Sequence, residues 1–338
     1  MTPGIIGDLA RAAHYAGAVL PFGSLLFLLT VARPACRAAA CGTALLGAAV
    51  RDARRLAAAG LVLALLASLP WLLSTAAMMS GQALDASLLH GVLGTVLVET
   101  QFGRLWTARF ALGLLLGLLL WLHERVKPMR AKIVVEDASL LAGAVFLASI
   151  ALTGHAFAEE GAGRFWHLGA DLLHLLAAGA WLGALPALVL LLVRAGKSWP
   201  DALPRAAARF SSLGVASVAL LVLSGLTNGW FLVGTIPALI GTSYGRVLLV
   251  KLGLFLGMLA LAAVNRQRLT PRLRPDPNAG ARHALSRLRR NAILEIVLGL
   301  LILAVVGTLV GMTPAVHEQA QRGRPGSSAP MDAAPHLH

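Results

Sequence analysis

Eight long apolar stretches divide this chain of 338 residues and leave no room for a sizeable soluble domain. A helix needs ~20 apolar residues to cross ~30 Å of hydrocarbon, and most of the stretches reach that length. The chain is 57% hydrophobic and only 13% charged, which is typical of a membrane protein. The sequence therefore predicts an all-α, polytopic bundle of eight transmembrane helices. The expected spans cover approximately residues 9–32, 56–78, 105–122, 138–154, 166–193, 210–233, 246–264 and 291–311.

The basic residues predict how this bundle is oriented in the membrane. Of the 29 Lys and Arg, 21 fall in every second loop between the expected spans. Because cytoplasmic loops carry such an excess, these loops are expected inside and both termini in the periplasm, across a bacterial inner membrane. The lipid bilayer is then the main partner, and a nucleic-acid partner is not expected because no aromatic residues alternate with the basic ones. Tryptophans near the span ends support the register as interfacial belts: Trp71, Trp106, Trp166, Trp230 and Trp121.

A short motif occurs twice and indicates an internal repeat. Residues 100–105, followed by Arg109, share the pattern T-x-[FY]-G-R-x4-[RK] with residues 242–247, followed by Lys251. Because each copy would hold an even number of spans, we predict two parallel four-helix repeats, with a site where they meet. The predicted division is a first half over residues 1–137, with its fourth span continuing to about 154, a second over 138–312, and a disordered periplasmic tail over 313–338.

The basic residues of the motif have two interpretations. Arg104 and Arg246 come directly at the outer ends of their spans, where a long side chain can reach the lipid head groups. Arg109 and Lys251 lie about a turn and a half deeper. Interfacial anchoring is one interpretation of this set, and coordination or steering of charge is the other.

Histidine is concentrated toward the expected outer side, where eight of the ten fall. His167, Asp171 and His174 are spaced i, i+4 and i+7, so they share one face of the fifth span. His14 lies at the equivalent depth of the first span, and His155 precedes the fifth span at the membrane boundary. Ionisable groups inside a span are costly unless they face a cavity or partner, so these residues are candidate metal ligands. Hydrogen bonding between packed helices is the alternative.

Soft ligands fall on the same predicted side of the membrane. Met78 and Met79 end the second span, and Met312 ends the eighth. Thioether and imidazole together suit copper, and Cu(I) in particular, although methionine also serves as apolar filler. Cys36 and Cys41 lie instead in the first cytoplasmic loop, where thiols stay reduced, and their C-x4-C spacing is more often incidental than metal-binding.

Two longer runs of sequence resemble the copper resistance protein D (CopD) family of bacterial inner-membrane proteins. They are T-G-H-A at residues 153–156, then D-L-L-H-L-L-A-A-G-A-W-L-G at 171–183. The stretch from Arg209 to Glu295 resembles it too, so that a CopD-like region covers residues 138–312. The resemblance implies a role in copper handling across the membrane, beside a periplasmic copper-binding protein as partner.

The leading hypothesis is therefore a non-enzymatic copper protein that moves or passes Cu(I) or Cu(II) from the periplasm toward the cytoplasm. No nucleophile–base pair or phosphate loop is apparent in the sequence. An alternative is an electron-transfer cytochrome in which His14 and His174 ligate a haem. A third is a structural or assembly subunit whose histidines only pack helices.

Overall fold

The computed structural model describes residues 2–39, 43–81, 91–154, 163–198, 201–273 and 278–322. Within these ranges the chain is helical and contains no strand. Eight helical segments in the described part of the chain are long and apolar enough to cross a membrane, which confirms the all-α prediction. They are Gly4–Ala38, Ala44–Ser80, Gln101–Arg125, Met129–Thr153, Gly163–Arg194, Ala202–Leu232, Ser243–Arg272 and Ala279–Leu309.

The first four spans are built from seven elements. They are α1 (Pro3–Phe27), which continues through the π-helix η1 (Leu28–Ala32) into α2 (Arg33–Ala38); α3 (Thr43–Ser80); α6 (Gln101–Arg125); and α7 (Met129–Ala148) with η2 (Ser149–Thr153).

Two of the last four spans, the fifth and the seventh, are interrupted. The four spans are α9 (Gly163–Leu182) with α10 (Leu185–Ser198); α11 (Ala202–Leu232); α13 (Ser243–Val264) with the π-helix η3 (Asn265–Leu269) and η4 (Thr270–Arg272); and α14 (Ala279–Leu309). Three short helices complete the described chain: α5 (Val92–Glu99), α12 (Ile236–Gly241) and α15 (Ala315–Arg322).

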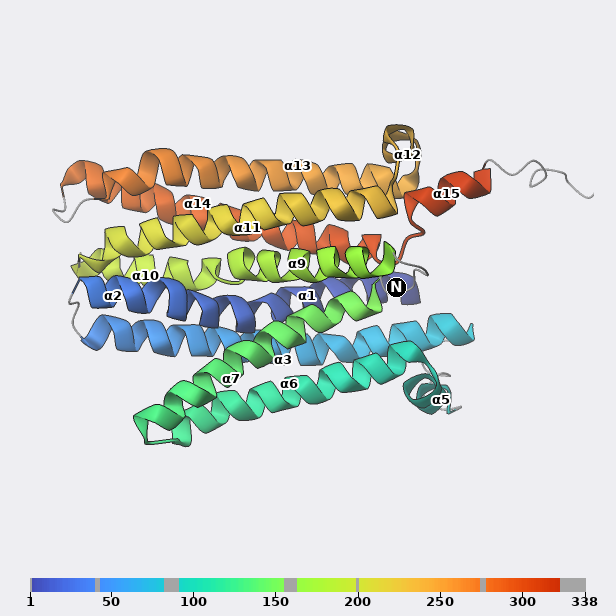
Figure 1. Cartoon of the computed structure of the whole chain (residues 1–338), viewed down its shortest axis with the longest axis horizontal. Coiled ribbons are helices and arrows are strands. Elements are labelled where there is room, and N and C mark those ends of the chain that lie inside the picture. The colour runs from blue at the N-terminus through green and yellow to red at the C-terminus, as the bar shows by residue number, and fades with distance from the viewer. Residues whose placement is uncertain are drawn as a thin grey trace, which may run out of the picture.

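The spans run side by side along the long axis of the molecule, and α1 packs against α3, α7, α9 and α14 (Figure 1). The N-terminus, α5, α12 and α15 lie at one end of this bundle (Figure 1). Helices α2, α6 and α10 end, and α3, α7, α11 and α14 begin, at the other end, which is the end of the described arginines that adjoin the arginine-rich loops (Figure 1). We therefore refer to the first end as the outer end, following the predicted orientation.

Helix α1 crosses α9 at a point where only glycine fits. A Cβ on Gly23 would overlap the backbone of Gly179 and Gly183, and a Cβ on Gly183 would overlap the Val19 carbonyl. Lipid provides no hydrophobic force that holds membrane helices together, so their contacts depend on close packing. Small residues allow that close approach. The regular helix is also interrupted here, since α9 ends at Leu182 and α10 begins at Leu185.

The two copies of the repeated motif have the same local structure. Thr100 and Thr242 are the N-cap residues of α6 and α13, and each hydroxyl accepts a hydrogen bond from the backbone N–H three residues later at 3.0 Å. Each cap follows a short helix, α5 or α12, at the outer end of the bundle. The cap satisfies an otherwise unpaired helical donor. The division of the whole chain into two repeats remains a prediction.

The tryptophans divide into two groups. Trp166, Trp230 and Trp121 are 78%, 75% and 53% exposed on the bundle surface, where an interfacial belt lies. Trp71 and Trp106 are 3% and 9% exposed, so the belt interpretation is wrong for them. The indole of Trp106 donates a hydrogen bond to the Ser68 carbonyl at 3.0 Å, which places it between packed helices.

Candidate functional site

The three polar residues on α9 face helix α11. His167 is buried and its ring stacks on Phe231 of α11, with 4.8 Å between ring centroids and 5° between planes. One turn further along α9, Asp171 accepts a hydrogen bond from the Asn228 side-chain amide at 3.3 Å. The Asn228 carbonyl oxygen is buried and has no hydrogen-bond partner among the described residues. An imidazole, a carboxylate and an amide oxygen therefore line this part of the α9–α11 contact.

The hydrogen bonds of His174 fix which of its ring nitrogens can bind a metal. Its Nδ1 lies 3.0 Å from the Ser224 hydroxyl, which donates its one proton to the Leu220 carbonyl at 2.6 Å. With the serine proton placed there, Ser224 accepts from Nδ1–H of His174 and Nε2 carries the lone pair. The ring also hydrogen bonds to the Leu221 backbone. This is how metal-binding histidines are commonly held, with the second nitrogen donating to a neighbouring oxygen.

Helix α13 brings a positive charge to the same region. Lys251 interacts electrostatically with Asp171 and with His174. Tyr244, from the repeated motif, and Tyr15 of α1 also interact electrostatically with Asp171. Asp171 is thus the carboxylate on which polar groups of α1, α9, α11 and α13 converge.

His14 has a hydrogen bond of the same kind in different surroundings. Gly17 and Gly60 let α1 and α3 approach closely, since a Cβ on Gly17 would lie 2.6 Å from the Gly60 carbonyl oxygen. This contact brings the Ala64 carbonyl 2.8 Å from Nδ1 of His14. A carbonyl can only accept, so Nδ1 donates and the lone pair is again on Nε2. That nitrogen is buried and has no hydrogen-bond partner among the described residues.

Aromatic rings enclose His14. Trp71, Phe146 and Tyr15 lie 5.3, 6.0 and 6.1 Å from it between ring centroids. Arg109 interacts electrostatically with His14, and its guanidinium carbon lies 5.5 Å from the Trp71 ring centroid. His14 and His174 each interact with one positive charge, but Lys251 beside His174 also interacts with the Asp171 carboxylate. The apolar enclosure of His14 therefore suits copper less well than the surroundings of His174.

The basic residues of the repeated motif occupy two kinds of position. Arg104 and Arg246 are exposed on the bundle surface near its outer end. Arg109 is buried and donates hydrogen bonds to the Ser149 hydroxyl and carbonyl and to the Thr153 hydroxyl, at 3.0, 2.8 and 3.1 Å. It therefore ties α6 to η2.

The remaining candidate ligands lie apart from α9 or outside the described residues. Met78 and Met79 are 58% and 57% exposed at the end of α3. Met312 packs against apolar side chains that include Tyr244. His155 lies outside the described residues; Gly154, which precedes it, is close to Asp171, because a Cβ there would lie 3.4 Å from Oδ2.

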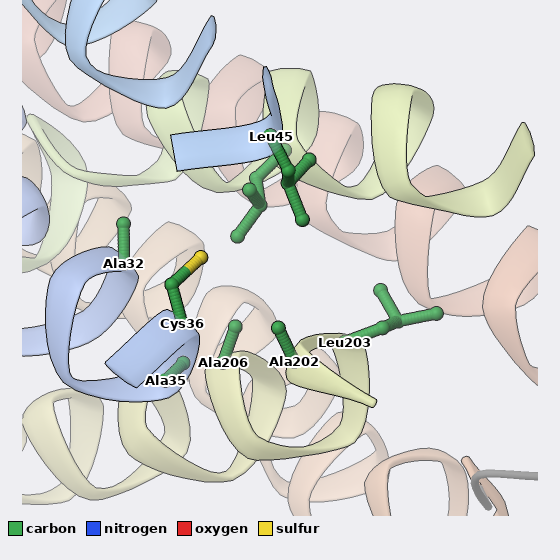
Figure 2. A pocket seen from close by; sticks show the side chains of 8 residues that line it. Ala32, Ala35, Cys36, Leu45, Ala202, Leu203 and Ala206 are labelled. Atoms are coloured by element: carbon green, nitrogen blue, oxygen red, sulfur yellow. The ribbon is translucent and has the colours of Figure 1, made fainter. Parts of the chain in front are cut away.

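Within the described ranges, no three His, Cys, Asp or Glu side chains gather closely enough to hold a metal ion together. A pocket does lie near the predicted cytoplasmic end, where the Cys36 thiol points inward from α2 (Figure 2). Its other lining residues are apolar and come from η1, α2, α3, α10 and α11: Ala32, Ala35, Leu45, Leu191, Ala202, Leu203 and Ala206. This pocket therefore offers no ligand set, and Cys41 lies outside the described residues.

Two residues that position the α9 site were not among the predicted site residues. Ser224 orients His174, and Asn228 contacts Asp171. Both are polar residues inside an apolar span, four positions apart, and thus on one face of α11. This spacing was the available signal.

Comparison with known proteins covers both halves of the chain. The family model "Copper resistance protein D" matches residues 204–309, and "Copper resistance protein D-like, N-terminal domain" matches residues 3–166. Copper resistance protein D of Pseudomonas syringae pv. tomato is 34% identical over 313 residues, which cover 90% of this chain and 95% of that protein.

Two further relatives cover less of the chain. Copper transport protein CutJ of Bacillus subtilis is 36% identical over 61% of this chain, but that region is only 37% of CutJ. Inner membrane protein YebZ of Escherichia coli is 29% identical over 64% of this chain and 70% of its own length. No solved structure matches significantly. The eight spans and the extent of these matches agree: the chain is a multi-pass inner-membrane protein that belongs to the copper resistance protein D family.

Proposed function

We propose that this protein binds copper in the outer half of the fifth span and passes it from the periplasm toward the cytoplasm. The observation that carries the proposal is the orientation of His174, whose Nδ1 is held by Ser224 so that Nε2 carries the lone pair, on the same helix face as Asp171. Imidazole is a good ligand for copper, and the names of two relatives refer to copper resistance and copper transport. Because no three such side chains in the described ranges gather around one point, we propose that His167, Asp171 and His174 contact copper one after another along α9.

The charges around the proposed site suit a passing ion better than a permanently bound one. Asp171 offsets the charge of copper, while Lys251 interacts with the same carboxylate and opposes a second positive charge. A transport site must bind well enough to admit an ion and weakly enough to release it. Lys251 provides the weakening, and the membrane potential can drive an inward step with ~2.3 kcal/mol per charge per 100 mV.

The other candidates take secondary roles in this proposal. His14 has an available lone pair but is enclosed by rings, so we assign copper first to His174. Met78, Met79 and Met312 would collect Cu(I) at the outer end, where the proposed periplasmic copper-binding partner would deliver it. The transfer is non-enzymatic, because a ligand-exchange step breaks and forms only metal–ligand bonds.

The proposal is tested on the purified full-length protein by measuring bound metals and the visible spectrum. His174→Ala removes the proposed ligand, and His283→Ala, an exposed residue of the arginine-rich cytoplasmic region, is the matched control. We expect copper in the wild type and in H283A and its loss in H174A. Equal copper in all three proteins would contradict the assignment, and iron with a Soret band would favour the cytochrome instead.

A further inference from the structure

A second buried polar cluster lies near the cytoplasmic side, away from the α9 site. Glu295 of α14 is 2% exposed and accepts a hydrogen bond from the Asn265 side-chain amide at 2.7 Å. The Asn265 carbonyl oxygen in turn accepts from the Asn291 amide at 2.9 Å. The Trp181 side chain of α9 also hydrogen bonds to Glu295. All three partners are uncharged.

The backbone around Glu295 is irregular on two neighbouring helices. Asn265 begins the π-helix η3, an uncommon geometry that is frequent at functional sites. Trp181 is the second-last residue of α9, next to the break between α9 and α10 at residues 183–184. Transporters commonly place such interruptions where an ion passes, because the altered backbone lines the route. Glu295 thus lies at the meeting point of two interruptions, about 7.5 Å further into the membrane than Arg290, at 1.5 Å per helical residue.

Glu295 has no ion-pair partner among the described residues. The elements packed against α14 are α1, α9, α10, α13, η3 and η4. The acidic and basic side chains of α1, α9 and α13 lie toward the outer end or pair with other residues. Arg194 of α10 forms an ion pair with Asp52. The basic side chains of η3 and η4 are exposed. The groups concerned are Asp8, Arg11, His14, Tyr15, Arg164, His167, Asp171, His174, Arg194, Tyr244, Arg246, Lys251, Arg266, Arg268 and Arg272.

The first half of the chain contains a useful contrast. Glu136 of α7 is equally buried, at 4% exposed, but it forms an ion pair with Arg33 at 2.6 Å. His123 lies 4.0 Å from the same carboxylate. Counting from the repeated motif, His123 and Asn265 each come 23 residues after the capping threonine. The first carboxylate therefore has permanent counter-charge and the second has only neutral hydrogen-bond donors.

We propose that Glu295 is a proton-binding site that exchanges its proton with passing copper on the cytoplasmic half of the route. Burying a carboxylate without a counter-charge costs far more than burying the neutral acid, so the resting site holds a proton. When copper arrives, the O–H bond breaks, the proton leaves to the cytoplasm, and the ion supplies the counter-charge. When copper leaves to the cytoplasm, a proton returns from the same side. This inference rests on the proposed copper route.

The first test needs no copper. Infrared difference spectra of the purified protein between acid and alkaline pH report carboxylic acid C=O bands. We expect a band from a buried acid in the wild type that is absent in Glu295→Gln and retained in Glu136→Gln. E295D keeps an acid and is expected to restore a shifted band, which separates loss of the carboxyl group from loss of packing. An unchanged band in E295Q overturns the proposal.

The second test measures copper uptake into liposomes containing the protein in one orientation, with the pH varied on the side of the cytoplasmic loops. Protons compete with copper at Glu295, so acidification there is expected to slow uptake by the wild type and E136Q but not by E295Q. The same pH dependence in E295Q overturns the proposal. If neither the wild type nor any variant takes up copper, the proposed function fails, and the infrared result still decides whether Glu295 binds a proton.

Discussion

Replacing Ser224 by alanine should weaken copper binding without removing any copper ligand. The wild-type hydroxyl accepts from Nδ1–H of His174 at 3.0 Å and so keeps the lone pair on Nε2. Without it, the ring keeps only its hydrogen bond to the Leu221 backbone and can rotate or change tautomer. The net loss of one hydrogen bond costs about 0.5–1.5 kcal/mol. Partners of this kind commonly contribute 10–100-fold to metal affinity, so we expect a Kd about 10–100 times higher in S224A.

The assay is competition for Cu(I) against a chromophoric chelator in detergent solution. Ser217→Ala is the matched control, because Ser217 lies on α11, is 2% exposed, and its hydroxyl has no hydrogen-bond partner among the described residues. S217A should bind copper like the wild type. Wild-type affinity in S224A, together with loss of binding in H174A, would refute the reasoning that the serine orients the ligand.

Three further substitutions test other parts of the account. Gly183→Val should lower the melting temperature in detergent, because its side chain would overlap the Val19 carbonyl and overpacking commonly costs about 1–3 kcal/mol. Gly169→Ala in the same span, with open space beside it, should not lower it. Arg109→Met should also lower the melting temperature, since it removes three hydrogen bonds, whereas exposed Arg104→Met should have little effect. Asn228→Ala should reduce copper affinity about tenfold, because Asp171 loses its amide donor; unchanged affinity would argue against a role for Asp171.

The transmembrane spans could be predicted because length and hydropathy determine them almost alone. The bilayer thickness sets the minimum length of an apolar run, and even the short fourth run corresponds to a span in the structure. What could not be predicted is which side of each helix faces inward. Lipid is as apolar as the bundle core, so Trp71 on the inside and Trp121 on the outside have the same sequence signal.

The candidate site was predictable only in part, for a related reason. The spacing of His167, Asp171 and His174 placed them on one helix face, since helical geometry is local. Their partners on α11 depend on how two helices pack, as does the enclosure of His14 by rings from α3 and α7. Spacing along one helix cannot give such contacts. Met78 and Met79 were predicted on the same side of the membrane as the α9 residues, but they are exposed at the end of α3. A shared side of the membrane therefore does not predict contact.

The central claim is that copper moves inward past His174, and copper uptake into liposomes with a known protein orientation tests it most directly. With the arginine-rich loops facing the lumen and the membrane potential negative inside, the wild type should accumulate copper. H174A should not accumulate it, and H283A should behave like the wild type. Equal accumulation by the wild type and H174A, or none in protein-containing liposomes beyond that in protein-free ones, would contradict the account.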